Sequence, residues 1–397
     1  MASRAVSASA LVALAMVSGL ATPSTVLASG AARHPSTWQP RAGVTELAVA
    51  LVREAPDEPT AIAADSDGVV VVGRSGAAFA YAPDGREQWR IDPEGDVGSR
   101  LHPIALGEGL VVVPVFDPPV GSGVLALERS TGRTRWEVSV AEPRSVAVGP
   151  APDGSTVVAV VERSGAVTLL RADDGTAVTQ VPLGFGHLLG VPHVWVRDGR
   201  VIVAWAHDDA AEIRVLDGGT GEIHWAWSGP GLGAAPAVGH DRLILVENTE
   251  IDGDVVHAEA RGLDLATGAV QWSTPVDGAF LPTAPVALSG GRALVVDLDG
   301  MLIALDARTG QVRWRRATRL VQIEAAPLLT RSVAAMTTYG TGLVALSART
   351  GMPIRNQVPG PVQTVVTIED STAAAGSLLL LVRHRAGEGE IWWLRPS

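Results

Sequence analysis

A tryptophan-ended motif recurs at regular intervals along this chain. The segment ALDARTGQVRW ends at Trp314, and close copies are ALERSTGRTRW ending at Trp136, VLDGGTGEIHW ending at Trp225 and GLDLATGAVQW ending at Trp272. Weaker copies end at Trp89, Thr179 and Arg355. Glycines shared by the copies lie 41 to 47 residues apart, which is the length of one four-stranded propeller blade. The repeat therefore predicts an all-β fold.

Each part of the motif has a physical role. The Ala-Leu-Asp segment is predicted to form a strand, and the glycine that follows can adopt a positive φ in a tight turn. A large indole at one fixed position of each outer strand can pack between neighbouring blades and bury about 150 to 250 Å². We therefore interpret five tryptophans as structural blade-docking residues and not as ligand platforms: Trp89, Trp136, Trp225, Trp272 and Trp314.

The sixth repeat shows how four strands fit one period. Its strands are predicted at Ala284–Leu288, Ala293–Asp297, Met301–Asp306 and Val312–Arg316, from the innermost to the outermost. Gly290-Gly291 and Asp299-Gly300 are hairpin signals between them.

Seven repeats run from about Pro59 to Gly360, and an eighth lacks its outermost strand. The alternating segment Thr45–Val52 stands alone ahead of the first repeat. If it supplies the missing strand, the two chain ends are tied together and no open edge remains. We therefore expect an eight-bladed β-propeller of four-stranded antiparallel blades, with the last blade closed by this N-terminal strand.

The first residues resemble an export signal. Arg4 precedes an apolar stretch from Ala10 to Ala21, and small residues around Ala28 suit a cleavage site. We expect residues 1–28 to be a signal peptide, residues 29–44 a flexible leader and residues 45–397 a single propeller domain. The chain has no Cys to carry a lipid, so the protein is expected to be secreted or extracytoplasmic without a lipid anchor or a membrane span.

The charge balance argues against one class of partner. The formal net charge is −11 and every basic residue is Arg. An acidic chain without a dense basic segment lacks the electrostatic footprint of a nucleic-acid binder. Oligomeric state is not indicated by the sequence, and a monomer is favoured.

The copies of [AV]-L-D-x-x-T-G-x-x-x-W resemble the repeats of the pyrroloquinoline-quinone (PQQ) dehydrogenase superfamily. The likeness covers nearly all of the expected mature chain. The same repeat serves quinone-dependent dehydrogenases and non-catalytic relatives, among them the outer-membrane barrel-assembly propeller lipoprotein, which this chain resembles in architecture. The resemblance therefore implies a fold more strongly than a function.

Catalytic members of that superfamily imply a specific site. They hold PQQ beneath a vicinal disulfide, with a calcium or lanthanide ion ligated by Glu and Asn and with an Asp base. This chain has no Cys, and its two Asn residues, Asn248 and Asn356, lie in no motif that matches the metal site. We therefore expect no catalytic residues, no metal site and no cofactor. PQQ with Ca²⁺ belongs only to the alternative interpretation.

Other motifs have structural explanations. Two Asp-x-Asp-Gly segments, Asp65–Gly68 and Asp297–Gly300, could be calcium loops, but the Glu expected at the twelfth position is absent, which favours hairpin turns. His187 and His193 lack a third ligand at a recognisable spacing, so we interpret them as loop residues.

A partner would bind where the loops between blades converge. The segments joining each outermost strand to the next innermost strand lie around the central channel on one face, where rigid scaffolds carry variable loops. The candidate partner-binding rim consists of Arg100, His102, Arg144, His187, His193, Phe280, Gln322 and Glu324.

Three functions remain open from the sequence. The first is an exported non-catalytic propeller that binds or scaffolds a protein or cell-envelope partner. The second is a PQQ-dependent alcohol or sugar oxidoreductase, and the third is a carbohydrate-binding or carbohydrate-cleaving propeller.

Overall fold

A computed structural model describes most of the chain from residue 46 onward. The described residues are 46–55, 59–73, 76–91, 104–117, 121–184, 192–207, 210–229, 231–252, 255–276, 278, 280, 286–297, 299–318, 327–338, 342–356, 362–368, 377–383 and 389–396. Every regular element among them is a β-strand. None of these described segments is a helix that could cross a membrane. The predicted signal peptide and leader lie outside the described residues and stay predictions.

The strands form eight sheets, one for each blade, and in seven of these sheets the strands are consecutive along the chain. Blades 1 to 4 comprise β2 Pro59–Asp65, β3 Gly68–Gly73, β4 Ala78–Tyr81 and β5 Glu87–Ile91; β6 Ala105–Gly107, β7 Leu110–Asp117, β8 Gly121–Glu128 and β9 Thr134–Ser139; β10 Pro143–Pro150, β11 Thr156–Glu162, β12 Ala166–Arg171 and β13 Ala177–Pro182; β14 His193–Arg197, β15 Arg200–His207, β16 Ala210–Asp217 and β17 Ile223–Gly229.

Blades 5 to 8 continue the order. They comprise β18 Leu232–Val238, β19 Arg242–Asp252, β20 Val255–Asp264 and β21 Val270–Pro275; β22 Ala287–Ser289, β23 Arg292–Val296, β24 Met301–Asp306 and β25 Val312–Ala317; β26 Leu328–Leu329, β27 Val333–Thr338 and β28 Gly342–Ser347; β30 Val362–Ile368, β31 Ser377–Arg383, β32 Gly389–Pro396 and, as the outer strand, β1 Glu46–Ala55.

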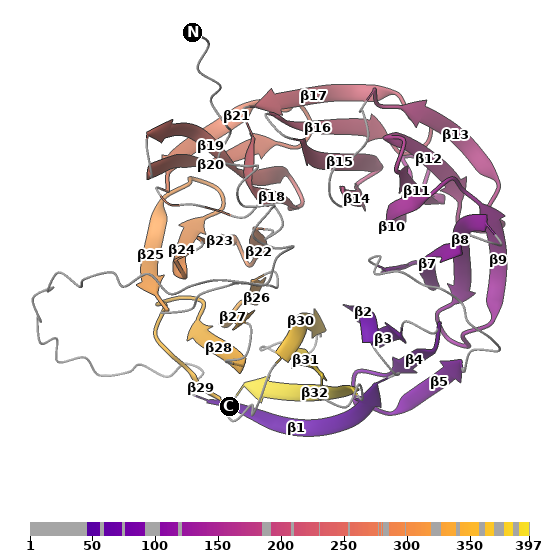
Figure 1. The fold of residues 1–397 in the computed structure, drawn as a ribbon, viewed down its shortest axis with the longest axis horizontal. Helices are drawn as coiled ribbons and strands as arrows, with labels where there is room; N and C mark the ends of the chain where they lie inside the picture. The colour runs from indigo at the N-terminus through magenta and orange to yellow at the C-terminus, as the bar shows by residue number, and fades with distance from the viewer. Residues whose placement is uncertain are drawn as a thin grey trace, which may run out of the picture. The chain divides into compact units, whose positions relative to one another are not determined.

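The blades close into a ring, as Figure 1 shows. The innermost strands of successive blades contact one another around the circle, and β30 of blade 8 contacts β2 of blade 1. The predicted eight-bladed propeller is therefore confirmed.

The ring is closed by the N-terminal strand. β1 pairs antiparallel with β32, with Val52 opposite Trp392 and Arg53 opposite Ile391. β1 is thus the fourth strand of blade 8, as the sequence predicted from Thr45–Val52. Leu51 of this strand packs against the core between blades 8 and 1, beside the buried Trp393.

Blade 7 departs from the pattern. Among the described residues, its outer edge is paired by a single bridge between Leu346 and Pro353, and the following strand β29, Arg355–Asn356, leaves the blade. β29 pairs in parallel with β1, opposite Glu46 and Leu47. The closing strand therefore joins blade 7 as well as blade 8.

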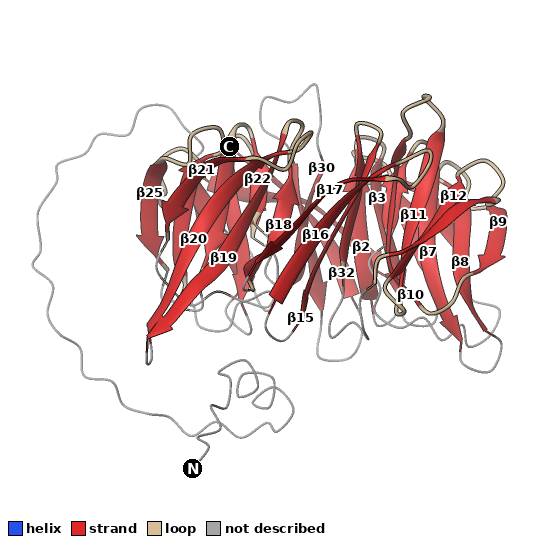
Figure 2. Ribbon diagram, turned by 90° about the horizontal axis from the view of Figure 1, so that it is seen from above, coloured by secondary structure: helices blue, strands red, loops and turns tan. Residues whose placement is uncertain are grey.

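The two faces of the ring differ in what they carry. In a four-stranded antiparallel blade, the first and third turns lie on one face, which we call the turn face. The second hairpin and the connection to the next blade lie on the opposite face, which we call the linker face. Figure 2 shows short turns along the turn face. Of the predicted rim residues, Arg144 and His193 are described at strand ends on the linker face.

Five motif indoles cross from one blade to the next. Their Nε1 atoms donate hydrogen bonds of 2.7–3.1 Å to backbone carbonyls of the following blade. The pairs are Trp89 with Arg129, Trp136 with Ala172, Trp225 with Leu265, Trp272 with Ala307 and Trp314 with Ala348. Since the indole N–H is satisfied, these side chains can pack between blades without leaving a buried donor unpaired.

The motif glycine faces the indole of the preceding blade. Gly310 has a φ of 72°, and a Cβ built there would lie 2.4 Å from Cε3 of Trp272. Gly268 faces Trp225 in the same way, at 2.8 Å. Glycine is therefore required twice at this position, by the backbone conformation and by the flat ring beneath it.

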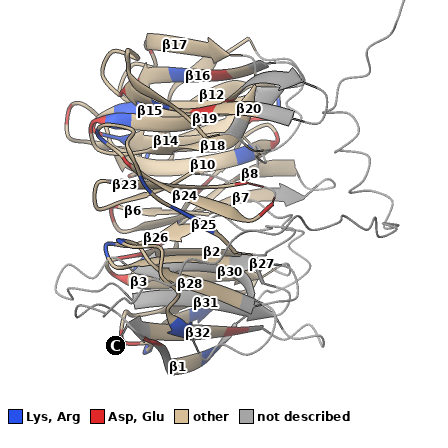
Figure 3. Cartoon of the chain, turned by 90° about the vertical axis from the view of Figure 1, so that its left-hand side faces the viewer, with Lys and Arg blue, Asp and Glu red and all other residues tan. Residues whose placement is uncertain are grey.

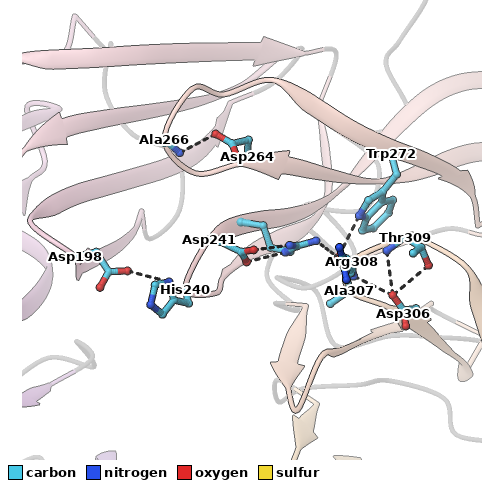
Figure 4. A network of polar contacts seen from close by, with 11 residues as sticks. Asp198, His240, Asp241, Asp264, Ala266, Trp272, Asp306, Ala307, Arg308 and Thr309 are labelled. Atoms are coloured by element: carbon cyan, nitrogen blue, oxygen red, sulfur yellow. Dashed lines mark hydrogen bonds and ion pairs between the residues drawn. The ribbon is translucent and has the colours of Figure 1, made fainter.

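The Asp and Thr of the motif hold the turn together. In blade 6, Oδ1 of Asp306 accepts hydrogen bonds from the backbone N–H groups of Arg308 and Thr309 and from the Thr309 hydroxyl, as Figure 4 shows. The same arrangement recurs at Asp217 and at Asp264. A hydrogen bond from Arg313 is the largest cause that lowers the pKa of Asp306 to about 2, and the turn bonds lower it further.

Candidate functional site

The predicted rim is only partly within the described residues. Arg144, His193 and Phe280 are described, whereas Arg100, His102, His187, Gln322 and Glu324 lie outside the described residues. Arg144 is the second residue of β10 and is half-buried. It lies at the linker-face end of an innermost strand, where a ring of such ends surrounds the centre.

His193 begins β14 at the same end of its blade. Its imidazole stacks on the indole of Trp195, with 5.9 Å between ring centroids and 18° between the planes. Burial lowers the pKa of His193, so the ring is neutral at pH 7. A neutral imidazole can donate one hydrogen bond and accept another, and it does not attract anions by charge.

Phe280 lies in the core. Its side chain is 5% exposed and packs with Val276 and Val286 in the cluster between blades 5 and 6. The prediction treated Phe280 as a rim residue, but in the structure its ring is packed against other apolar side chains. Apolar residues in loops can be packing residues as well as contact residues, and the sequence pattern does not distinguish these roles.

A set of acidic side chains lies buried near the linker face, and sequence reasoning missed it. In blades 3 to 6, one position near the end of the second strand is structurally equivalent. In each of these blades it lies five residues after the first residue that pairs with the third strand. The residues there are Glu162, Trp205, Glu247 and Asp297, each less than 7% exposed. Trp205 belongs to the core shared with the preceding blade, and the residues two positions before the three acidic ones, Val160, Leu245 and Val295, belong to the equivalent cores. Because strand side chains alternate, all four side chains face the preceding blade at the linker-face end of a contact between blades.

Neutral donors satisfy the carboxylate of Glu162. Oε1 accepts hydrogen bonds from the hydroxyl of Thr168 at 2.5 Å and from the amide of Gln180 at 2.7 Å. Both partners belong to blade 3. This carboxylate is therefore part of a polar cluster within one blade.

Glu247 lies in an ion-paired cluster of blade 5. A terminal guanidinium nitrogen of Arg261 lies 2.6 Å from Oε2 of Glu247. Arg261 also donates two hydrogen bonds to Oε2 of Glu259, and the hydroxyl of Ser273 donates another to the same oxygen. Burial raises the pKa of Glu247, and Arg261 opposes this effect. Asn248, the next residue, points to the opposite face of the strand because successive strand side chains alternate.

Asp297 caps a hairpin. Its Oδ1 accepts the backbone N–H of Met301 at 2.7 Å, and burial raises its pKa. In the other Asp-x-Asp-Gly segment, Asp65 accepts the backbone N–H of Asp67 and pairs with the buried Arg129. Both segments are therefore turns whose aspartates are engaged by the protein itself.

Blade 4 carries indoles outside the motif. Trp195, Trp205 and Trp227 all lie in this blade in addition to Trp225. The guanidinium of Arg214 lies over the ring of Trp205, 5.6 Å from its centroid, and Arg214 forms an ion pair with Glu212. The only sequence signal for this cluster is an excess of Trp in one repeat.

The chemistry that these groups can perform is limited. Among the described residues, no three His, Asp or Glu side chains are grouped closely enough to hold a metal ion. The Glu and Asn of a quinoprotein metal site would have to converge, but Glu247 is committed to Arg261 and Asn248 points away from it. Glu247 and Asn248 therefore do not fit that ligand set, and we derive no step through a quinone.

Comparison with known proteins shows the family. Residues 36–188, 120–283 and 256–389 each match the family model described as outer membrane protein assembly factor BamB. The chain belongs to this family. The expected relationship to PQQ-like propellers and to the barrel-assembly propeller is thereby confirmed.

Two curated relatives carry the same name. The outer membrane protein assembly factor BamB of Burkholderia pseudomallei is 25% identical over 304 residues, which is 74% of each chain. The protein of that name from Yersinia pestis is 25% identical over 236 residues, or 55% of this chain and 58% of the relative.

Solved structures share the fold. BamB from Moraxella catarrhalis superposes with a TM-score of 0.62 at 17% identity, covering 87% of this chain and 97% of that one. A quinohemoprotein alcohol dehydrogenase from Pseudomonas putida gives a TM-score of 0.57 at 14% identity, covering 89% of this chain and 76% of the enzyme. One fold thus serves an assembly factor and an enzyme, so the choice between them depends on the site.

Proposed function

We propose that this chain is an exported, non-catalytic propeller of the BamB family that binds a protein or cell-envelope partner through its linker face. Family membership is the observation that carries the proposal, because the matched relatives are named as assembly factors. Because of that name, we expect the partner to be a protein component of the cell envelope.

The described groups near the linker face support a binding role. The carboxylates of Glu162, Glu247 and Asp297 are each engaged by side chains or backbone of the protein. These bonds lie within single blades and stiffen the linker-face ends of blades 3, 5 and 6, which supports a binding surface. A stiff ring with variable connections is suited to presenting a recognition surface.

Cross-linking capture tests the proposal. Purified protein carrying a photo-activated cross-linker would be mixed with an envelope fraction, and captured proteins identified by mass spectrometry. Arg144→Glu reverses a charge on the linker face, and Arg133→Glu is the matched change in an exposed turn of the opposite face. We expect Arg144→Glu to reduce capture and Arg133→Glu to leave it unchanged. Equal capture by both variants, or no captured protein with the parent, would contradict the proposal.

The oxidoreductase alternative has its own assay. PQQ and Ca²⁺ would be added to the purified protein, and the bound quinone followed by absorbance together with dye-linked oxidation of alcohols and sugars. We expect neither bound absorbance nor turnover. Turnover that depends on both additions would replace the binding role with a catalytic one.

A further inference from the structure

Blades 6 and 7 carry arginines on the turn face that have no acidic partner among the described residues. Arg308, Arg331 and Arg349 are all exposed. Arg313 lies close by, but it is paired with Asp306 at 2.6 Å. Asp306 is therefore already neutralised, and it does not offset the charge of the other three.

The three side chains belong to one connected surface. The backbone N–H of Ala307, next to Arg308, donates to Gly291, and that of Ala348, next to Arg349, donates to Ser332. Arg292 of blade 6 reaches across to the carbonyl of Arg331 in blade 7, at 3.4 Å. Hydrogen bonds within and between the blades thus hold these turns side by side, and they fix the backbone from which the guanidinium groups project.

Among the motif copies, an arginine two residues before the shared glycine occurs only in blades 6 and 7. Arg308 and Arg349 occupy the same motif position, two residues before the shared glycine. In the preceding repeats that position is filled by Pro83, Ser130, Asp173, Gly219 and Ala266. The repeat framework therefore does not require a cation there.

The sector also contrasts with the rest of the chain. Residues 286–356 contain nine arginines and four acidic residues, although the whole chain has 31 basic and 42 acidic residues. The neighbouring turns of blades 4 and 5 carry Asp198, Asp241 and Asp264, which Figure 4 labels together with Arg308. Figure 3 views the ring from the side of blade 6, with the arginines of β25 in blue.

We propose that the arginine sector, defined as Arg292, Arg308, Arg331 and Arg349, binds an acidic polypeptide segment. Guanidinium groups pair with carboxylates through two parallel hydrogen bonds, and a fixed set of them recognises closely spaced carboxylates.

A flat anionic membrane would also lie against the carboxylates of blades 4 and 5, which repel it. A short acidic segment can contact the sector alone. The site is on the face opposite the proposed linker-face partner, so the ring can hold two partners at once.

A fluorescent polyglutamate peptide provides the probe. Its binding to the full chain would be followed by anisotropy at low and at physiological salt. We expect the triple change Arg308→Ser, Arg331→Ser and Arg349→Ser to weaken binding about tenfold, and salt to weaken binding to the parent protein. The matched control is Arg86→Ser, Arg133→Ser and Arg171→Ser, which removes three exposed arginines from blades 1 to 3 and changes the net charge equally. Thermal melts of both triples check that they fold.

Each outcome decides the proposal. A loss confined to the sector triple supports it. Equal losses in the two triples, or no loss in the sector triple, overturn it. Binding to phosphatidylglycerol vesicles without binding to the peptide overturns it in favour of a lipid surface. The linker-face proposal is tested separately, because Arg144→Glu is expected to reduce envelope capture and to leave peptide binding unchanged.

Discussion

The contact between blades 5 and 6 and the contact between blades 3 and 4 solve one packing problem with different side chains. Between blades 5 and 6, Trp272 lies beneath Gly310 and donates to Ala307. Between blades 3 and 4 the motif position is Thr179, and the methyl groups of Thr179 and Val181 lie beneath Gly221. The motif glycine is present at both contacts, whereas the motif indole is present only at the contact between blades 5 and 6.

The difference shows that the indole is one way to fill a fixed gap. At the contact between blades 3 and 4, the inner part of the seam carries the indole of Trp205 instead, packed with Leu183 and Val203. At the contact between blades 8 and 1, a Cβ on Gly85 would meet Leu51 of the closing strand. Each contact thus keeps its packing while the residue that supplies it changes.

Removing the closing strand is expected to have the largest effect. Deletion of Glu46–Ala55 removes the outer strand of blade 8, its pairing with β29, and the Leu51 side chain from the core between blades 8 and 1. We expect the Tm to fall by more than about 10 °C in scanning calorimetry. The single change Val52→Ala, at a side chain 37% exposed, should shift the Tm little. An unchanged Tm after the deletion would show that the ring does not depend on this strand.

Truncating the side chain at the motif position should have different effects on stability at the two contacts. Trp272→Ala removes a buried indole and its hydrogen bond, and should lower the free energy of unfolding by about 3–5 kcal/mol. Thr179→Ala removes a few atoms from a half-buried site and should cost less than about 1 kcal/mol. Urea unfolding of both variants measures the difference. Similar losses would mean that the indole does not carry the contact between blades 5 and 6.

Adding a methyl group to the motif glycine sharpens the same comparison. Gly310→Ala would drive a Cβ against the rigid ring of Trp272 and should cost about 2–4 kcal/mol. The Cβ of Gly221→Ala would meet methyl groups of Val181 and Thr179 in place of a rigid ring, so this change should cost less. Gly109 has a φ of 75° with nothing within 4 Å, so Gly109→Ala measures the backbone cost alone, about 1 kcal/mol. If the three variants lose equal stability, the indole does not restrict this position.

Acid should weaken the turn of blade 6 by a small amount. The folded-state pKa of Asp306 is about 2, below the ordinary value of 3.8, so its contribution is present above pH 3.8 and is lost as the pH falls toward 2. Solvent screening limits this contribution to about 1 kcal/mol. Asp306→Asn should therefore reduce the fall in Tm between pH 5 and pH 2, compared with the parent protein. An identical pH profile would show that the capped aspartate does not contribute.

The sequence predicted the ring because its signals repeat. The period of the motif gave the number of blades, and the lone alternating segment ahead of the first repeat indicated β1. The third strand of blade 6, Met301–Asp306, has the bounds that were predicted. These features depend on neighbours along the chain, where strand and turn chemistry are visible.

Contacts between blades were harder to predict. The equivalence of Glu162, Glu247 and Asp297 appears only once the strand registers are known, because the hairpin lengths differ between repeats. The two-residue strand β29 is too short to have a pattern, and its pairing with β1 depends on the arrangement of the ring. Phe280 shows the same limit, because a loop position does not reveal whether a ring packs inward.

The antiparallel pairing of β1 with β32 is the most direct test of the closed ring. Because the chain has no Cys, a Glu54→Cys and Glu390→Cys double variant contains only the two introduced thiols, at positions that face each other in the register. Facing residues of antiparallel strands are close enough for a disulfide. We expect mild oxidation to join them, as shown by thiol titration and by mass spectrometry of a digest. The offset pair Val52→Cys and Glu390→Cys should keep free thiols. Free thiols in the first variant, or a bond in the offset variant, would contradict the account of how the ring closes.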